Sequence, residues 1–171
     1  FVGSNNDRWA LQEIGTDEFC LPTRGSDWYD GAYYQKVHHH AYTEDMAFVN
    51  NGWYGFSMGV ALARDALEDL AKIDFDALGF ADGTRESMLN QQKVLVASLY
   101  LDGLDLFGGV PLYTTTQSDI KGRSTDLETF NFIDSLLTEA IPELPLKEEL
   151  GAQETGSINR AAAAALKVRL Y

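Results

Sequence analysis

The sequence contains a single cysteine, Cys20, among 171 residues. One cysteine cannot form a disulfide within the chain and cannot supply a cysteine-rich metal cluster. The neighbours of Cys20 do not form a lipidation signal, which would need a hydrophobic leader before the cysteine. We therefore interpret Cys20 as a small buried hydrophobic residue.

Basic residues are also scarce, with 13 Lys and Arg against 26 Asp and Glu and a formal net charge of −13. A nucleic-acid partner needs clustered Lys and Arg to neutralise its phosphates, and the sequence has no such cluster. We therefore expect no nucleic-acid binding. A neutral ligand such as a sugar is compatible with this charge, but the charge does not select one. The excess of carboxylates equally fits a protein surface that must stay soluble.

Long hydrophobic runs are missing, since no apolar stretch approaches the roughly 20 residues of a membrane span. The chain starts at Phe1 without an initiator methionine, and it stops at Tyr171 within an alanine-rich stretch. No Gly, Asn or Pro ends that last helical pattern. We expect residues 1–171 to be part of a longer protein, cut at both ends.

Sustained alternation of apolar and polar residues is missing too, so a large sheet is not expected. Helical periodicity is present instead. The four main helices start at intervals of about 30 to 40 residues, in the range of tetratricopeptide-type hairpins. The predicted class is all-α, with tetratricopeptide-like helical hairpins in an incomplete domain. The predicted helices span residues 5–14, 45–73, 84–106, from Thr125 to about 141, and from about Ser157 to the end.

Caps and apolar stripes give these helices further detail. Thr43 is the predicted N-cap of the helix over 45–73, and Thr125 with Glu128 forms a capping box. The glycines of the helix over 45–73 predict a close helix approach or a kink. On the helix over 84–106, Asp102 is expected off the buried face. Five alanines, Ala161–Ala165, predict close packing on a neighbouring helix. The stripe expected over 45–73 comprises Val49, Trp53, Phe56, Val60, Ala63, Leu67 and Leu70.

Residues 16–44 predict a long ordered loop rather than a linker, because aromatic residues are dense and prolines and glycines break any period. Sugars present apolar C–H faces, which stack on flat rings, and hydroxyl edges, which pair with polar side chains. This loop supplies both kinds of group within thirteen residues. The alternative is that the rings turn inward and brace the loop. The candidate site residues are Trp28, Tyr29, Asp30, Arg24, Asp27 and Tyr33.

Other chemistry is weakly supported. Three adjacent histidines, His38 to His40, point in different directions on a helix or a strand, so we predict no metal site there. Asp27 and Asp30 could act as a glycosidase pair, or they could cap turns. The sequence shows no matched acid and nucleophile, no phosphate loop and no catalytic triad. We therefore expect neither an enzyme nor a bound cofactor.

Four segments, in this order along the chain, resemble the SusD/RagB family. Trp9-Ala10-Leu11-Gln12-Glu13 followed by Thr16-Asp17-Glu18 is similar to the segment that opens the family's aromatic loop. The stretch from Pro22 to Gly31 is similar to a version of that loop. Asp105 to Leu112 resembles the family's Asp-Leu-Phe-Gly-x-x-Pro turn, and Ile158 to Tyr171 resembles its Arg-Ala-x-x-x-Ala-Ala helix, which ends in Leu-Tyr.

This resemblance implies that residues 1–171 are the N-terminal helical part of a SusD-like domain. It implies a glycan-binding lipoprotein on the extracellular face of the outer membrane, anchored by a lipidated cysteine upstream of Phe1. The implied partners are an oligosaccharide or polysaccharide and a SusC-like TonB-dependent transporter, and the implied activity is binding.

The chain departs from the starch-binding prototype of this family at one place. The prototype has a Trp-x-Trp pair soon after Thr-Asp-Glu, where this chain has Cys20 to Arg24. The prototype's ring positions therefore cannot be carried over to this chain one for one. We predict that Trp28, Tyr29 and Tyr33 take the place of those rings, because of their chemistry and their location in the loop. Two alternatives remain: a helical-repeat scaffold that binds only a protein partner, and a glycosidase.

Overall fold

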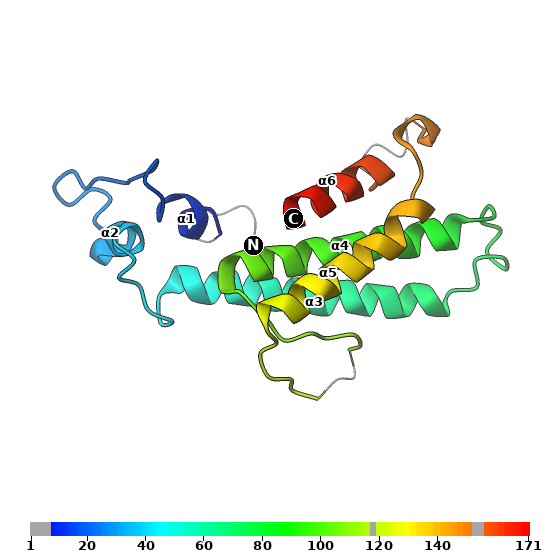
Figure 1. Cartoon of the computed structure of the whole chain (residues 1–171), viewed down its shortest axis with the longest axis horizontal. Helices are drawn as coiled ribbons and strands as arrows, with labels where there is room; N and C mark the ends of the chain where they lie inside the picture. The colour runs from blue at the N-terminus through cyan, green and yellow to red at the C-terminus, as the bar shows by residue number, and fades with distance from the viewer. Residues whose placement is uncertain (1–7, 117–118, 152–155) are drawn as a thin grey trace. The chain divides into compact units, whose positions relative to one another are not determined.

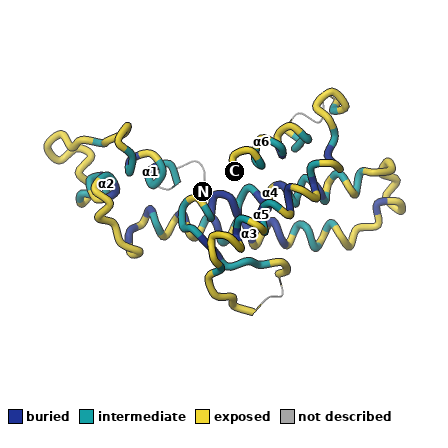
Figure 2. The backbone as a smooth tube through the Cα atoms, in the orientation of Figure 1, coloured by how far each residue is buried: buried dark blue, intermediate teal, exposed yellow. Residues whose placement is uncertain are grey.

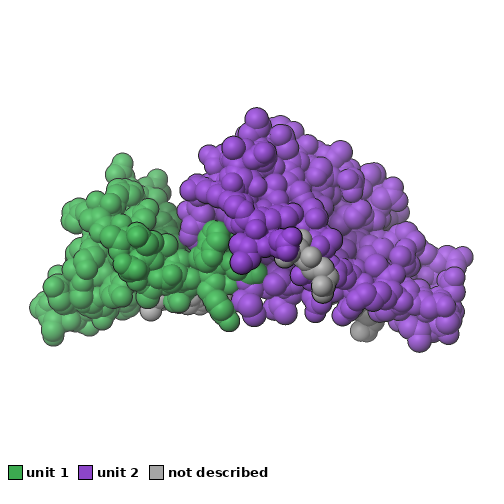
Figure 3. Space-filling view, turned by 90° about the horizontal axis from the view of Figure 1, so that it is seen from below, with its two compact units in different colours: residues 1–57 green, residues 58–171 purple. Residues whose placement is uncertain are grey.

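A computed structural model describes residues 8–116, 119–151 and 156–171. The chain divides into two compact units, residues 1–57 and 58–171, which are coloured separately in Figure 3. The described residues form α-helices and short 3-10 helices, without a β-strand, so the predicted all-α class is confirmed. Within the described residues, every helix is too short or too polar to cross a lipid bilayer.

The first unit begins with helix α1, Arg8–Glu13. The start of this helix was predicted at Asn5, which lies outside the described residues. The prediction of one long loop over residues 16–44 is wrong, because the 3-10 helix η1 (Asp30–Ala32) and helix α2 (Tyr33–His38) lie within it. The buried residues of α2, Tyr34 and Val37, are one turn apart, but so short a helix gives almost no periodic signal among dense aromatic residues.

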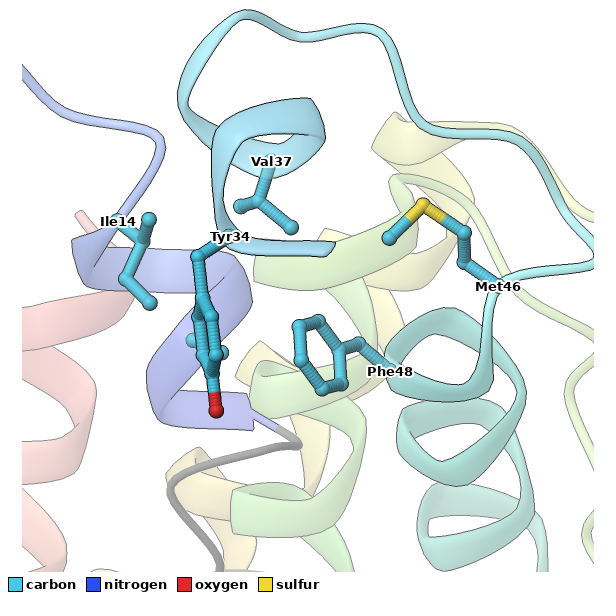
Figure 4. Close-up of a cluster of buried hydrophobic side chains, with 6 residues drawn as sticks. Ile14, Tyr34, Val37, Met46 and Phe48 are labelled. Atoms are coloured by element: carbon cyan, nitrogen blue, oxygen red, sulfur yellow. The ribbon is translucent and has the colours of Figure 1, made fainter. Parts of the chain in front are cut away.

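A small hydrophobic cluster stabilises the first unit. Figure 4 shows Tyr34 and Val37 of α2 facing Ile14, which follows α1, and Phe48 at the start of α3. Each of these side chains is at most 5% exposed. Burying such side chains stabilises a fold by roughly 1.5–3 kcal/mol each. The cluster therefore holds together the two segments that flank the aromatic stretch.

Helix α3, Ala47–Lys72, begins four residues after its predicted cap. Thr43 instead forms a turn in which its carbonyl accepts a hydrogen bond from the Met46 N–H at 3.1 Å. The Asn50 side-chain amide donates to the carbonyl of Glu44 at 2.9 Å and strengthens this entry. The stripe prediction is wrong at Trp53, whose side chain is 41% exposed, whereas Phe56, Val60 and Ala63 are buried.

Three further helices of the second unit are α4 (Thr84–Phe107), α5 (Asp126–Ala140) and α6 (Arg160–Leu170). Successive helices run in opposite directions in Figure 1, and α4 and α5 pack along each other. The predicted capping box is confirmed. The Thr125 hydroxyl accepts from the Glu128 N–H, and the Glu128 carboxylate accepts from the Thr125 N–H at 2.8 Å. Short 3-10 helices, η2 (Ile141–Glu143) and η3 (Lys147–Glu149), precede α6.

Helix α4 is buried on more sides than its periodicity predicted, because its buried residues include the consecutive run Tyr100–Gly103. Figure 2 shows buried residues along this helix in dark blue. The expectation that Asp102 lies off the buried face is wrong, because Asp102 is 8% exposed. Its carboxylate is 3.6 Å from the Arg169 guanidinium of α6, so the charge is paired. The predicted close helix approach is confirmed at Gly59, where an added Cβ would lie 2.8 Å from the Leu99 side chain.

The connection between α4 and α5 is tied down by side chains. The Gly109 N–H donates to the Asp126 carboxylate at 2.6 Å. A Cβ on Gly109 would overlap the Ser124 carbonyl oxygen, so only glycine fits there. Further along, the Glu68 carboxylate of α3 accepts hydrogen bonds from the Thr116 N–H and hydroxyl at 2.7 and 2.6 Å. These hydrogen bonds lower the pKa of Glu68.

Two further predictions need correction. Cys20 is exposed, not buried, because it lies in the extended segment after α1. Helix α6 starts at Arg160, where the Asn159 side chain accepts a hydrogen bond from the Ala162 N–H. Of the five alanines, only Ala163 is buried.

Candidate ligand-binding site

The aromatic loop, defined as residues 16–32, is shaped by a tight turn at its centre. Arg24 and Asp27 exchange two backbone hydrogen bonds, each of 3.0 Å. Gly25 takes a positive φ of 64°, which a residue without a side chain adopts freely. The turn therefore brings the backbones of Arg24 and Asp27 side by side.

Left-handed backbone conformations follow the turn. Trp28 has φ of 58°, Asp30 of 40° and Ala32 of 65°, and all three carry side chains. Such conformations cost of order 1–3 kcal/mol each and persist only where the surroundings impose them. A hydrogen bond of 2.6 Å from the Ala32 N–H to the Tyr29 carbonyl helps to hold this segment. The rings of Trp28 and Tyr29 are thus set by a specific backbone path.

A chain of ring contacts connects Trp28 to the hydrophobic cluster. The Trp28 ring lies 5.6 Å from the Tyr34 ring, with an angle of 59° between the planes. Tyr34 in turn lies 5.7 Å from Phe48, and Tyr33 lies 5.2 Å from the same ring. Figure 4 shows the Tyr34 and Phe48 rings side by side. Trp28 is therefore braced on one side by a buried ring, at separations typical of favourable aromatic pairs.

The structure places the six predicted site residues in two groups. Trp28 is 40% exposed and Tyr29 is 53% exposed, and Tyr29 has no ring partner among the described residues. Arg24, Asp27 and Asp30 are exposed beside them along the loop. Tyr33 is half-buried against Phe48, so its ring belongs mainly to the packing. Five of the six predicted residues are therefore accessible to solvent on the loop.

Tyr34 and Phe48 are the residues that sequence reasoning left out of the candidate site. Both are buried, and Tyr34 contacts Trp28 directly. Burial raises the pKa of the Tyr34 hydroxyl, and the negative charge of Asp30 adds to the rise. Asp30 is therefore close enough to the ring pair for its charge to act on it. The i, i+3 spacing of Tyr34 and Val37 gave a weak sequence signal that both are buried, and it gave no signal for the contact between Tyr34 and Trp28.

The three adjacent histidines make contacts of their own. The His38 Nδ1–H donates a hydrogen bond to the Ile14 carbonyl at 3.1 Å, and the His38 ring packs edge-on against that of His39 at 5.3 Å. The described part of the chain holds no group of three or more His, Cys, Asp or Glu side chains arranged to bind a metal ion.

A hollow of about 390 Å³ lies at the turn between α3 and α4 in the second unit. It is open and mainly polar, and Phe75 supplies its one aromatic side chain. That ring is buried and pairs with Phe80 at 5.3 Å. The exposed rings expected of a sugar site are on the aromatic loop and not in this hollow.

Solved structures of SusD-like proteins share this fold. The surface glycan-binding protein A of Bacteroides uniformis superposes with a TM-score of 0.79 at 18% identity, over 99% of this chain and 37% of its own. A SusD-like protein of Bacteroides fragilis gives a TM-score of 0.76 at 21% identity, over 96% and 31%. A laminarin-binding SusD-like protein gives 0.68 at 20% identity, over 86% and 31%.

The chain spans between a quarter and two fifths of the length of such structures, from 25% to 39%. No sequence-family model matches the chain, and no curated protein sequence is significantly similar to it. The fold of the chain is therefore that of part of a SusD-like protein.

Proposed function

We propose that this chain is the N-terminal helical part of a cell-surface glycan-binding protein and that its aromatic loop contacts the glycan. One observation carries the proposal. Trp28 and Tyr29 are 40% and 53% exposed on the loop, and the Trp28 ring packs against the buried ring of Tyr34. An exposed ring that is already held in place loses little conformational entropy when a ligand stacks on it.

The chemistry of the loop suits a carbohydrate. The outward faces of Trp28 and Tyr29 would stack on the C–H faces of sugar rings. The Arg24 guanidinium offers paired donors to neighbouring hydroxyls, and the carboxylates of Asp27 and Asp30 accept hydrogen bonds from others. Tyr33 contributes mainly by packing its ring against Phe48, which holds the end of the loop in place.

The names of two solved structures with this fold support the same ligand class, one being a surface glycan-binding protein and the other a laminarin-binding protein. We extend the proposal to the cellular role. The complete protein is held on the extracellular face of the outer membrane by a lipid anchor upstream of Phe1. It passes oligosaccharides or polysaccharides to a SusC-like TonB-dependent transporter. The chain acts by binding, and it needs no cofactor.

The two alternatives make different demands on the loop. A helical scaffold that binds only proteins would use the loop rings as internal bracing, whereas Trp28 and Tyr29 are turned outward. A glycosidase would release reducing sugar, and the release would stop in Asp27→Asn or Asp30→Asn. A panel of polysaccharides that shows retention without release would support binding and would remove the glycosidase.

Replacing Trp28 with alanine tests the proposal. The full chain is screened on a glycan array, and the retained polysaccharide is then used in affinity electrophoresis. We expect Trp28→Ala to weaken retention by at least about 30-fold, the effect of losing a binding hot spot worth about 2 kcal/mol. Far-ultraviolet circular dichroism should remain that of the helical fold.

Trp53→Ala is the matched control, because Trp53 is exposed to the same extent (41%) but lies on helix α3 outside the loop. It should retain the glycan as the unmodified chain does. Equal retention by Trp28→Ala and the unmodified chain would remove the loop from the binding site.

A further inference from the structure

We infer that the aromatic loop selects uncharged glycans and discriminates against glycans that carry carboxylate or sulfate groups. This inference rests on the glycan-binding function proposed above and specifies the ligand class. It follows from the signs and positions of the charges around Trp28.

The loop itself carries a clear excess of negative charge. Four carboxylates, those of Asp17, Glu18, Asp27 and Asp30, stand against the one guanidinium of Arg24. Each of the four acidic residues is exposed, so each carboxylate can interact with an approaching ligand. The loop therefore has a net charge of −3, and it repels anions.

Two of these carboxylates are close to the proposed stacking surface. Asp27 precedes Trp28 directly, and Asp30 follows it by two residues on the same left-handed segment. The charge of Asp30 also acts on Tyr34, whose ring is 5.6 Å from that of Trp28. A sugar stacked on Trp28 would thus lie in a negative field. An anionic group on that sugar would meet repulsion in addition to the loss of its hydration.

Arg24 does not reverse this field. Its backbone pairs with that of Asp27 across the tight turn, and side chains of directly opposed residues project to the same side. The one positive charge of Arg24 is outnumbered by the four carboxylates of the loop. The described residues give Arg24 no ion pair, so its guanidinium keeps its donors for sugar hydroxyls. Arg24 accordingly serves as a donor for neutral hydroxyls and not as an anchor for an anion.

Charge repulsion makes a quantitative prediction. A carboxylate at about 7 Å from a ligand charge in water changes the affinity by about threefold at low salt. Removing both Asp27 and Asp30 should then improve the relative affinity for an anionic glycan by about tenfold. The effect should fade as salt shortens the screening length from roughly 20 Å near 20 mM to about 3 Å at 1 M.

The test uses one glycan in two charge states. The neutral glycan that the array retains best is oxidised at its C6 primary hydroxyls to carboxylates, and both forms are titrated against the full chain at 20 mM and 1 M salt. The same titrations are made with the double variant Asp27→Asn/Asp30→Asn. Asparagine tolerates the positive φ of position 30. Glu148→Gln, an exposed substitution in η3, is a neutralising control in the second unit.

We expect the oxidised form to bind at least about tenfold more weakly than the neutral form at 20 mM salt. The difference in affinity between the two forms should become smaller at 1 M salt. The double variant should reduce the ratio of the two affinities about tenfold, and Glu148→Gln should leave that ratio as it is. Equal or tighter binding of the oxidised form would overturn the inference and leave the glycan-binding function intact. A loss of affinity on oxidation that is the same at 20 mM and 1 M salt, and the same in the double variant, would also overturn the inference. Failure to retain any neutral or anionic glycan would instead remove the proposed function itself.

Discussion

Replacing Tyr34 with leucine tests whether the buried ring positions Trp28 for binding. Leucine keeps an apolar side chain in the cluster but removes the ring that lies 5.6 Å from Trp28 and 5.7 Å from Phe48. Tyr34→Phe is the conservative partner, since it keeps the ring and both ring contacts.

The magnitudes follow from these two contacts. Each aromatic pair contributes about 0.5–1.5 kcal/mol beyond its buried area, so Tyr34→Leu should destabilise the first unit by about 2 kcal/mol. Without its brace, Trp28 must be ordered when the glycan binds, which costs about 0.5–1.5 kcal/mol for one side chain. We therefore expect the glycan affinity to fall by about 2- to 12-fold.

The assay is a double-mutant cycle on glycan affinity. It uses the unmodified chain, Tyr34→Leu, Trp28→Ala and the double variant, with urea unfolding measured on each. If Tyr34 acts through Trp28, Tyr34→Leu should change the affinity by less than about twofold once Trp28 is absent. Tyr34→Phe should bind as the unmodified chain does.

Three results would refute the reasoning. One is an unchanged affinity in Tyr34→Leu, which would mean that Trp28 needs no brace. Another is an equal loss in Tyr34→Phe, which would assign the effect to the hydroxyl. The last is full additivity in the cycle, which would mean that Tyr34 contributes to binding independently of Trp28.

Gly109→Ala should destabilise the second unit by about 3 kcal/mol, because the new Cβ overlaps the Ser124 carbonyl. Gly122→Ala, where a Cβ meets open space, should be neutral or slightly stabilising in the same thermal unfolding experiment. Equal effects of the two substitutions would contradict the close approach. The pKa of Glu68 is lowered in the folded chain, so its bonds to Thr116 stabilise the fold at neutral pH and are lost as the carboxyl becomes protonated below about pH 4.5. Glu68→Gln should therefore be less stable than the unmodified chain at pH 7, and urea unfolding should show this difference in stability shrinking as the pH falls below about 4.5. A difference in stability that does not change with pH would contradict this linkage.

The long helices were predictable because their signals are local. Thr125 and Glu128 are three residues apart, and their reciprocal hydrogen bonds form as the spacing predicted. Gly108 ends α4 with a positive φ of 72°, one residue after the helix. Such caps depend only on neighbours within one turn, so a single sequence contains them.

The error at Asp102 has a physical cause, which is dependence on a partner far along the chain. Asp102 is buried because Arg169, which is distant in sequence, reaches its carboxylate. Periodicity assigns a charged residue to the outer face because it carries no information about such a partner. Trp53 was assigned to the core by the same periodicity, although its ring remains 41% exposed.

The candidate site was predictable in composition and not in geometry. The sequence shows that Trp28, Tyr29 and Arg24 are close together, which is enough to suggest sugar chemistry. It does not show which rings turn outward, because that depends on Phe48 receiving Tyr33 and Tyr34. The short helix that carries these two tyrosines is the element that sequence reasoning missed.

The left-handed backbone at residues 25, 28, 30, 31 and 32 limits how this loop can be re-engineered. Libraries aimed at new sugar preferences should keep glycine at 25 and 31 and offer asparagine, aspartate or glycine at 30. Valine, isoleucine and threonine should be left out at 28 and 32, since branching at Cβ is disfavoured in that region of φ and ψ. Sequence variation is better introduced at positions 24, 27 and 29. The backbone there is not left-handed, so side chains can be exchanged without a change in the loop conformation.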